Sequence, residues 1–207
     1  MIMKQEFGKR SVCQSYRSMY QQLRQSVATI ASLTERELRL FEQQCIYREV
    51  PKKFTLVEEG QVARELYFIN RGCLRFYYNR DGDEITGFIF LENMFATALD
   101  SFLQQEPSAQ IVETLEDCEL LVISYSALQQ LYDYSTNFQI FGRKLAEQRL
   151  VNAQRILSSY ILDSPEERYR KLLATRPEWL LRVPQHYIAS FLGITPVSLS
   201  RIRKRMT

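Results

Sequence analysis

The stretch from Val183 to Met206, VPQHYIASFLGITPVSLSRIRKRM, predicts two short helices joined by a tight turn. We expect the first helix at Gln185–Leu192 and the turn at Gly193-Ile194-Thr195, where glycine can take the left-handed backbone conformation that other residues avoid. The hydroxyl of Thr195 can cap the next helix, Pro196 fits its first position, and residues 197–205 would form its body. This order of signals predicts a helix-turn-helix.

The two expected helices have different inner and outer faces. Small Ala189 would let them cross closely. The expected buried seam consists of Ile188, Leu192, Ile194, Leu199 and Ile202. The expected outer face of the second helix consists of Val197, Ser198, Ser200, Arg201 and Lys204. A capped helix with this basic exterior could enter the major groove of DNA.

The charge of the chain is distributed unevenly. The formal net charge is +3, but it is +8 from Arg168 onward and −5 over residues 1–167. A basic end on an acidic body is the pattern expected when one end meets phosphates. An ordinary solvated basic face is the alternative, and the coincidence with the helix-turn-helix favours the phosphate interpretation.

Composition limits the class of protein. With 207 residues and 45% hydrophobic content, the chain can form one large or two modest domains. It has no apolar run of about 18 residues and no signal-like start in MIMKQEFGKR, so we expect a cytoplasmic protein without membrane contact. The four cysteines are far apart, which predicts reduced thiols and no metal site; a redox role for Cys13 stays open.

The order of secondary structure follows from periodicity and turn residues. Residues 16–48 are expected to be helical, with a Thr34-x-x-Glu37 capping box inside them. From Val50 to Ser124, short β-type runs are divided by turns, and Asp81-Gly82 marks a hairpin. The expected strands lie at residues 66–69, 74–78, 85–90, 111–115 and 120–123. This spacing predicts an antiparallel barrel or sandwich.

A short helix at residues 126–131 and a long helix at residues 137–162 should follow. The long helix has two apolar sides, one with Phe138, Phe141, Leu145 and Ile156 and the other with Leu150, Val151, Leu157 and Ile161. Two apolar sides need two partners, so we expect one side on the β body and the other on a second chain. We divide the chain into residues 1–136, 137–162 and 163–207.

The start of the last part also has local signals. Ser164-x-x-Glu167 is a second capping box, and Pro165 fits a first helical position. Arg176-Pro177 should end that helix, and residues 179–183 are expected to be a short extended run.

A β-roll, a long helix and a C-terminal helix-turn-helix in this order resemble the Crp–Fnr family of bacterial transcription regulators. The resemblance covers residues 33–206 and is strongest over residues 189–204. It implies an α+β fold: an N-terminal antiparallel β-roll like a cyclic-nucleotide-binding domain with flanking helices, a long central dimerisation helix and a C-terminal winged helix-turn-helix. It also implies a homodimer that binds a palindromic site in double-stranded DNA, with RNA polymerase as a candidate partner.

The resemblance also implies roles for single residues. Arg201 falls where the family places a guanine-reading arginine, while Thr195, Ser198 and Lys204 fall where phosphates are held. Val197 and Pro196 replace polar base readers of the family, and Val197 could contact a thymine methyl group. The predicted DNA-binding set is Gln185, His186, Thr195, Pro196, Val197, Ser198, Ser200, Arg201, Lys204 and Arg205.

The ligand segment of the family is altered here. Cyclic-nucleotide binders have Gly-Glu and then Arg-Ser/Thr, whereas residues 95–109 contain Thr97-Ala98 and Pro107-Ser108. Because a buried phosphate without an arginine partner is costly, we expect no cyclic AMP binding. Iron–sulfur and haem cofactors also lack sequence support. The effector is therefore an unknown small molecule, or there is none.

The sequence is less consistent with two other function classes. A cupin-like enzyme or metal site would need inward-facing histidines or clustered carboxylates, but the single histidine is His186 in the helix-turn-helix. Asp81, Asp83 and Glu84 cluster in a hairpin turn and are expected to be solvated. These observations predict a protein that is not an enzyme. A β-barrel ligand-binding or protein-interaction module that has lost DNA binding remains the alternative, because of Pro196 and Val197.

Overall fold

The computed structural model describes the backbone of residues 9–206 and the side chains of residues 19–206. Two helices, α1 (Lys9–Ile30) and α2 (Glu35–Gln44), precede the sheets. Thr34 Oγ1 accepts a hydrogen bond from the Glu37 backbone N–H, and the Glu37 carboxylate accepts one from the Thr34 N–H at 2.7 Å. The predicted capping box is therefore confirmed, and it fixes where α2 begins.

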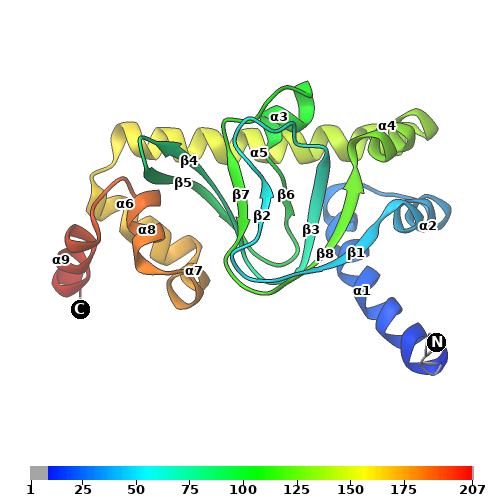
Figure 1. The fold of residues 1–207 in the computed structure, drawn as a ribbon, viewed down its shortest axis with the longest axis horizontal. Helices are drawn as coiled ribbons and strands as arrows, with labels where there is room; N and C mark the ends of the chain where they lie inside the picture. The colour runs from blue at the N-terminus through cyan, green and yellow to red at the C-terminus, as the bar shows by residue number, and fades with distance from the viewer. Residues whose placement is uncertain (1–8, 207) are drawn as a thin grey trace, which may run out of the picture.

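The strands of the described residues form two four-stranded antiparallel sheets, ordered β1-β8-β3-β6 and β2-β7-β4-β5. Figure 1 shows them as a roll in the middle of the molecule. The strands are β1 (Ile46–Val50), β2 (Thr55–Val57), β3 (Glu65–Arg71), β4 (Leu74–Arg80), β5 (Asp83–Phe90), β6 (Phe95–Ala96), β7 (Ile111–Thr114) and β8 (Cys118–Ser124). All five predicted strands are present, and β1, β2 and β6 are additional.

The hairpin between β4 and β5 turns at Asp81-Gly82, as predicted. Arg80 pairs with Asp83, and both turn residues have positive φ, 55° at Asp81 and 94° at Gly82. Two consecutive positive φ angles are the signature of a type I′ turn, which matches the twist of the flanking strands. The second strand of the hairpin, β5, is the edge strand of its sheet.

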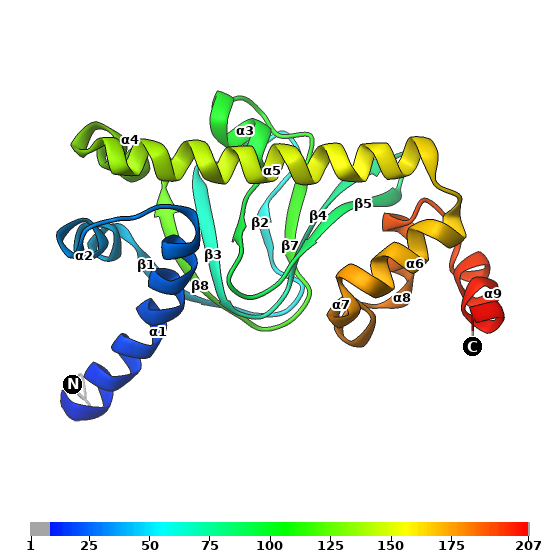
Figure 2. The same cartoon turned by 180° about the vertical axis from the view of Figure 1, so that it is seen from behind.

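Three helices follow or interrupt the roll: α3 (Leu99–Gln104), α4 (Tyr125–Tyr134) and α5 (Thr136–Leu162). Figure 2 shows α5 running along the whole roll from α4 to the C-terminal helices. In the first half of α5, Phe138 and Phe141 are fully buried. The Phe141 ring packs edge-on against the ring of Phe95 in the roll, and the two ring centres are 5.6 Å apart. One apolar side of α5 therefore faces the β body, as predicted.

Four helices complete the described chain: α6 (Pro165–Thr175), α7 (Pro177–Arg182), α8 (Gln185–Phe191) and α9 (Pro196–Met206). The predicted capping box at Ser164 is confirmed at the start of α6, where the Glu167 carboxylate accepts a hydrogen bond from the Ser164 N–H at 2.8 Å. Figure 1 places α9 at the end of the molecule farthest from α1.

The prediction of an extended run at residues 179–183 is wrong, because Pro177–Arg182 form α7. Pro177 follows the end of α6 and is itself the first residue of α7. Trp179 is fully buried, and its ring centre lies 5.3 Å from that of Phe88 in β5 and 5.1 Å from that of Phe191 in α8. This packing outweighs the β propensity of the Trp-Leu-Leu sequence. Since residues 163–206 contain no strand, the wing that was expected beside the helix-turn-helix is not found there.

Candidate nucleic-acid interface

The turn between α8 and α9 is built as the sequence predicts. Gly193 has φ +69°, and the Ile194 N–H donates to the Ala189 carbonyl at 3.0 Å. The Arg168 guanidinium donates two hydrogen bonds to the Leu192 carbonyl, at 3.1 and 2.9 Å. These bonds satisfy carbonyls that the end of α8 leaves free and fix the angle at which α9 departs.

The first turn of α9 is capped by side chains. Thr195 Oγ1 accepts a hydrogen bond from the Ser198 backbone N–H at 3.2 Å and lies 3.0 Å from Ser198 Oγ. Pro196 occupies the first position of the helix. The two hydroxyls therefore lie together at the positive end of the helix dipole, where an anionic group such as a phosphate is favoured.

The two faces of α9 are sorted as expected. Leu199 and Ile202 are only 1% and 4% exposed, whereas the Val197 side chain is 61% exposed. Arg201 lies on the exposed face and points away from the seam. The guanidinium is thus available to a ligand in solution.

The structure places the predicted site residues on one end of the molecule. Gln185 and His186 are exposed at the start of α8, and the His186 ring lies 3.9 Å from that of Tyr187. Arg205 forms an ion pair with Glu166 of α6 at 3.4 Å. The exposed members of the predicted set are Gln185, His186, Thr195, Pro196, Val197, Ser200, Arg201, Lys204 and Arg205, and Ser198 is half-buried.

The helix-turn-helix is docked on the roll through α8 and β5. The Thr86 backbone N–H donates to Ser190 Oγ at 2.9 Å, and Ser190 Oγ donates to the Glu84 carbonyl at 2.8 Å. Figures 1 and 2 both place α8 beside the β4–β5 hairpin and α9 on the outer side of it. Docking therefore leaves the outer face of α9 uncovered by the roll.

A buried arginine holds the same contact from the side of the roll. Arg75 on β4 is 1% exposed and forms ion pairs with Glu84 and Glu113. Its guanidinium carbon lies 4.0 Å from the centre of the Tyr77 ring and 3.6 Å from the centre of the Tyr187 ring of α8. The cation is stacked on aromatic faces and paired with carboxylates, so its burial is compensated.

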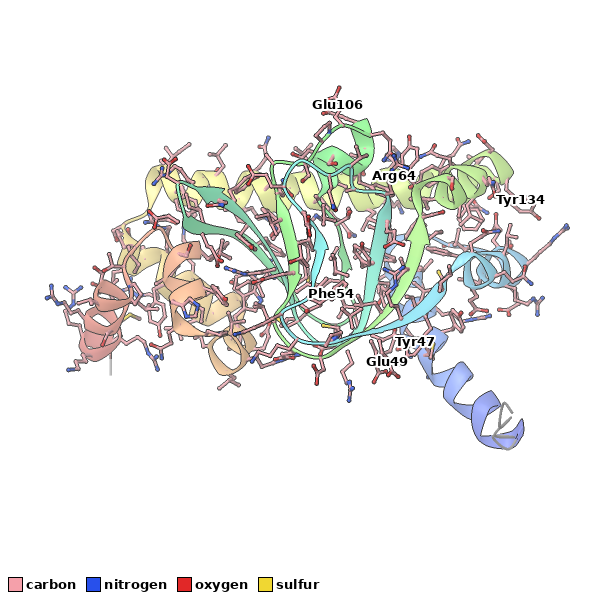
Figure 3. The ribbon with its side chains drawn as sticks, viewed as in Figure 1. Tyr47, Glu49, Phe54, Arg64, Glu106 and Tyr134 are labelled. Atoms are coloured by element: carbon pink, nitrogen blue, oxygen red, sulfur yellow. The ribbon has the colours of Figure 1, made fainter. Side chains whose placement is uncertain are left out.

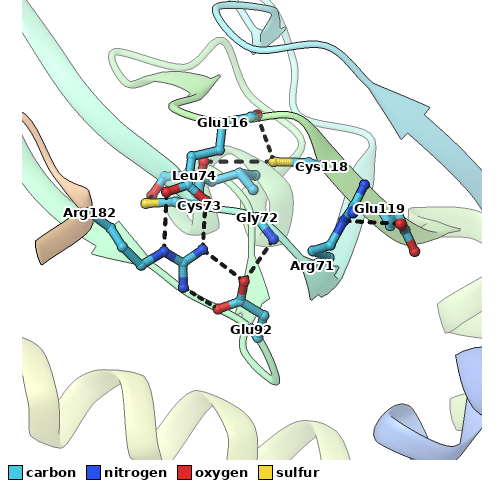
Figure 4. A network of polar contacts seen from close by, with 9 residues as sticks. All are labelled: Arg71, Gly72, Cys73, Leu74, Glu92, Glu116, Cys118, Glu119 and Arg182. Atoms are coloured by element: carbon cyan, nitrogen blue, oxygen red, sulfur yellow. Dashed lines mark hydrogen bonds and ion pairs between the residues drawn. The ribbon is translucent and has the colours of Figure 1, made fainter. Parts of the chain in front are cut away.

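A second arginine ties α7 to the roll. Arg182 donates to both oxygens of Glu92, at 2.6 and 2.8 Å, and to both oxygens of Glu116, at 3.1 and 2.6 Å (Figure 4). Glu92 also accepts a hydrogen bond from the Gly72 N–H at 2.8 Å. Burial opposes ionisation of Glu92, but these bonds outweigh it and lower the pKa of Glu92.

Sequence reasoning missed this docking. Glu84 is exposed, as expected, but its carboxylate also pairs with buried Arg75, which the sequence did not predict. The missed partners are separated by many residues, as Arg182 is from Glu92. No local spacing rule connects such residues in the sequence.

The segment that binds ligand in the family is internally bonded here. Thr97 Oγ1 donates to the Glu65 carbonyl at 2.8 Å, and Ser108 Oγ donates to the Gln110 carbonyl at 2.8 Å. Figure 3 shows Glu106 at the outer edge of the loop after α3, and its side chain is exposed. Both hydroxyls therefore donate their hydrogen bonds to backbone carbonyls of the chain.

Other kinds of site have little support in the described part of the chain. Cys45, Cys73 and Cys118 are free thiols; burial raises the pKa of Cys45 to about 12 and that of Cys118 to about 11. The side chain of Cys13 lies outside the described residues, so its redox role stays open. No group of three or more metal-ligating side chains occurs among the described residues. None of the described helices has the length and apolarity needed to cross a membrane.

Comparisons with known proteins identify a domain in the chain and proteins that are similar to it. Residues 47–135 match the family model of the cyclic nucleotide-binding domain. The CRP-like protein Clp of Xanthomonas euvesicatoria pv. vesicatoria is 25% identical over 175 residues, which are 77% of this chain and 76% of that protein.

Solved structures show the same fold. The c-di-GMP responsive global regulator CLP of Xanthomonas campestris has a TM-score of 0.64 at 22% identity, covering 84% of this chain and 91% of that one. FixK2 of Bradyrhizobium japonicum has a TM-score of 0.68 at 18% identity, covering 78% of this chain and 84% of that one. The fold is therefore a cyclic-nucleotide-binding β-roll with a long helix and a helical C-terminal part. The chain thus contains a cyclic nucleotide-binding domain at residues 47–135, and over most of its length it is similar to CRP-like transcription regulators.

Proposed function

We propose that this chain is a homodimeric transcription regulator that reads a palindromic DNA site with α9 and does not respond to cyclic AMP. The observation that supports it most directly is the geometry of α9, where Leu199 and Ile202 are buried while Arg201 is exposed. The division into a roll at residues 1–136, a central helix at 137–162 and a DNA-binding part at 163–207 is included in this proposal.

Arg201 would read a base, because its guanidinium can donate two hydrogen bonds to the major-groove edge of guanine. The Thr195 and Ser198 hydroxyls at the start of α9 and the Lys204 ammonium would hold phosphates. Gln185 and His186, at the start of α8, would contact the sugar-phosphate backbone of the DNA. The apolar Val197 side chain, which is 61% exposed, would lie against a thymine methyl group.

Dimerisation would use the second half of α5. Large apolar side chains are exposed there, in contrast to the buried first half of the helix. The exposed fractions are 61% for Leu150, 48% for Val151, 60% for Leu157, 71% for Ile161 and 79% for Leu162. Several large exposed apolar side chains on one stretch of helix are typical of a protein interface. A second copy is the expected occupant, because a dimer would place two α9 helices in successive major grooves about 34 Å apart.

The lack of a cyclic AMP response is supported by the internally bonded ligand segment. Thr97 and Ser108 are both buried and hydrogen-bonded to backbone carbonyls, and residues 95–109 contain no arginine to pair with a phosphate. Saturating cyclic AMP should leave the melting temperature unchanged. A stabilisation above about 2 kcal/mol would contradict this part of the proposal.

Selection of bound fragments from genomic DNA, followed by anisotropy titration, tests the DNA-binding part. We expect a two-fold symmetric motif, and Arg201→Ala should weaken specific binding by about 1–3 kcal/mol and relax one position in each half-site. Lys204→Ala should weaken binding to all sequences by a similar factor and reduce the salt dependence. Arg143→Met, on the exposed side of α5, is the matched control and should bind as wild type does.

Two outcomes would refute the proposal. If Arg201→Ala binds specific and scrambled DNA like the wild type, α9 does not read bases. If sedimentation shows a monomer at micromolar concentration, and Leu157→Glu changes nothing, α5 is not a dimer interface. A protein that binds no genomic fragment would favour the alternative, an interaction module that has lost DNA binding.

A further inference from the structure

A cleft of about 480 Å³ lies where α1, the β5–β6 turn, α5 and the end of α6 meet. Small-molecule sites commonly have volumes of about 300–1,000 Å³. Of the ligand segment at residues 95–109, only Phe95 lines this cleft. Its polar lining consists of Gln25, Ser26, Thr29, Asn93, Gln148, Arg149, Asn152 and Arg176. The cleft is therefore a separate feature of the fold, with both cationic and amide side chains.

The two arginines of the cleft are stacked on one aromatic side chain. The Arg149 guanidinium carbon lies 5.6 Å from the centre of the Phe88 ring and 4.6 Å from that of Phe90. The Arg176 guanidinium carbon lies 4.8 Å from the centre of the Phe88 ring and 5.1 Å from that of Trp179. Arg149 extends from α5 and Arg176 from the junction of α6 and α7, and packing against the aromatic rings holds both guanidinium groups in place.

Within residues 19–206, whose side chains the structure describes, neither arginine forms a hydrogen bond or an ion pair with a carboxylate. Arg176 donates a hydrogen bond to Asn152 Oδ1 at 3.1 Å, which is a neutral acceptor. Burial and the neighbouring Arg176 charge lower the pKa of Arg149 to about 10. Burial also lowers the pKa of Arg176, and Glu178 opposes that effect. Both charges are therefore desolvated, and only that of Arg176 is partly offset, by the nearby Glu178.

A desolvated guanidinium is costly unless an anion pairs with it, and two such groups in one cleft add mutual repulsion. Phosphate and carboxylate groups match the fork of N–H donors that a guanidinium presents. We propose that this cleft binds a small anion bearing a phosphate or carboxylate group, held between Arg149 and Arg176. Asn152, bonded to Arg176, and Gln148 supply the amide groups that can contact the remainder of the ligand.

The position of the site has a structural consequence. Arg149 belongs to α5, whereas Arg176 lies between α6 and α7 in the C-terminal part. An anion shared by the two side chains would connect the C-terminal helices to α5 and to the roll. This inference does not depend on DNA binding, since the ligand would contact no residue of α9.

The test uses the full chain and measures melting temperature and titration calorimetry with inorganic pyrophosphate and, separately, with citrate. Sodium chloride keeps the ionic strength constant. We expect a saturable rise in melting temperature with at least one of the two anions. Which anion acts, pyrophosphate or citrate, distinguishes a phosphate ligand from a carboxylate ligand.

The variants Arg149→Met and Arg176→Met keep the apolar stem and remove the charge. Each should weaken anion affinity about tenfold or more. Arg143→Met is the matched control, because Arg143 lies on α5 outside the cleft and is paired with Glu147 at 2.5 Å. It should respond to anions as the wild type does. If either cleft variant does not fold by circular dichroism, the lysine substitution at the same position replaces it and should bind with reduced affinity.

Equal anion responses in the wild type and the two cleft variants would overturn the inference, and so would a wild type that shows no saturable response to either anion. Both results are independent of the DNA titrations. Failure of the anion site is therefore distinguishable from failure of the proposed DNA-binding function.

Discussion

The junction between the roll and the C-terminal helices has two sides, and arginines are used differently on each. On one side, Arg75 and Arg182 each pair with two carboxylates. On the other side, Arg149 and Arg176 lie against Phe88 and form no ion pair with a carboxylate of residues 19–206.

The difference separates a structural role from a binding role for the same residue type. A guanidinium whose charge is already neutralised by two carboxylates holds two parts of the fold together and has little left to offer a ligand. A guanidinium that is packed but not neutralised remains able to bind an anion. Substitutions on the two sides should therefore have opposite consequences for stability.

The largest effect is expected for Arg75→Leu, on the paired side. Removing this 1% exposed cation leaves Glu113 and Glu84 without their partner and removes the stack on Tyr187. We expect a loss of about 3–5 kcal/mol in the free energy of unfolding, measured by urea denaturation. An unchanged unfolding midpoint would show that the pairing contributes nothing to docking.

Arg182→Leu should have a smaller effect, since its side chain is 30% exposed. We expect a loss of about 1–3 kcal/mol at pH 7. The pKa of Glu92 is lowered in the folded protein, so its contribution is present above its ordinary pKa of about 4.3 and is lost as pH falls through the lowered value.

Urea midpoints at pH 7 and pH 3.5 check this pH dependence. The difference in stability between wild type and Arg182→Leu should shrink at the lower pH. A constant difference would mean that Arg182 stabilises the fold through packing and not through the charge of Glu92.

Arg149→Met, on the unpaired side, should leave stability unchanged or raise it. An apolar side chain of similar shape removes a desolvated charge and its repulsion from Arg176, and it retains contact with Phe88 and Phe90. In chloride buffer we expect a gain of up to about 1 kcal/mol in the free energy of unfolding. A loss above about 2 kcal/mol would remove the contrast between the two sides.

The smallest effect is expected for Arg143→Met, which breaks an exposed ion pair with Glu147 on the surface of α5. Such pairs contribute about 0–1 kcal/mol, so the urea midpoint should stay within error of the wild type. This variant calibrates the other three, because it removes the same charge without affecting either side of the junction.

Local signals predicted much of this fold. The type I′ turn at Asp81-Gly82 and the capping boxes at Thr34 and Ser164 depend on residues close in sequence, and all three are present. The helix-turn-helix was predictable for the same reason, since Gly193 and Thr195 set its turn and cap. The spacing of the apolar residues of α5 also predicted the side that packs on the roll, where Phe138 and Phe141 are buried.

Nonlocal packing set the rest. The helical state of Pro177–Arg182 depends on burial of Trp179 against Phe88, which no window of sequence contains. Strands β2 and β6 have only three and two residues, too few for a periodic pattern. The pairing of Arg75 and the lack of pairing of Arg149 both arise from segments that meet only in the folded chain.

The Ser190 hydroxyl binds backbone groups of β5, which is the last strand of its sheet. A strand in that position has unpaired N–H and C=O groups that can recruit a strand from another molecule. By bonding to this edge, α8 occupies backbone groups that could otherwise pair with a strand of another molecule. Because Ser190 bonds to main-chain atoms, this contact does not use the side chains at positions 84 and 86 directly.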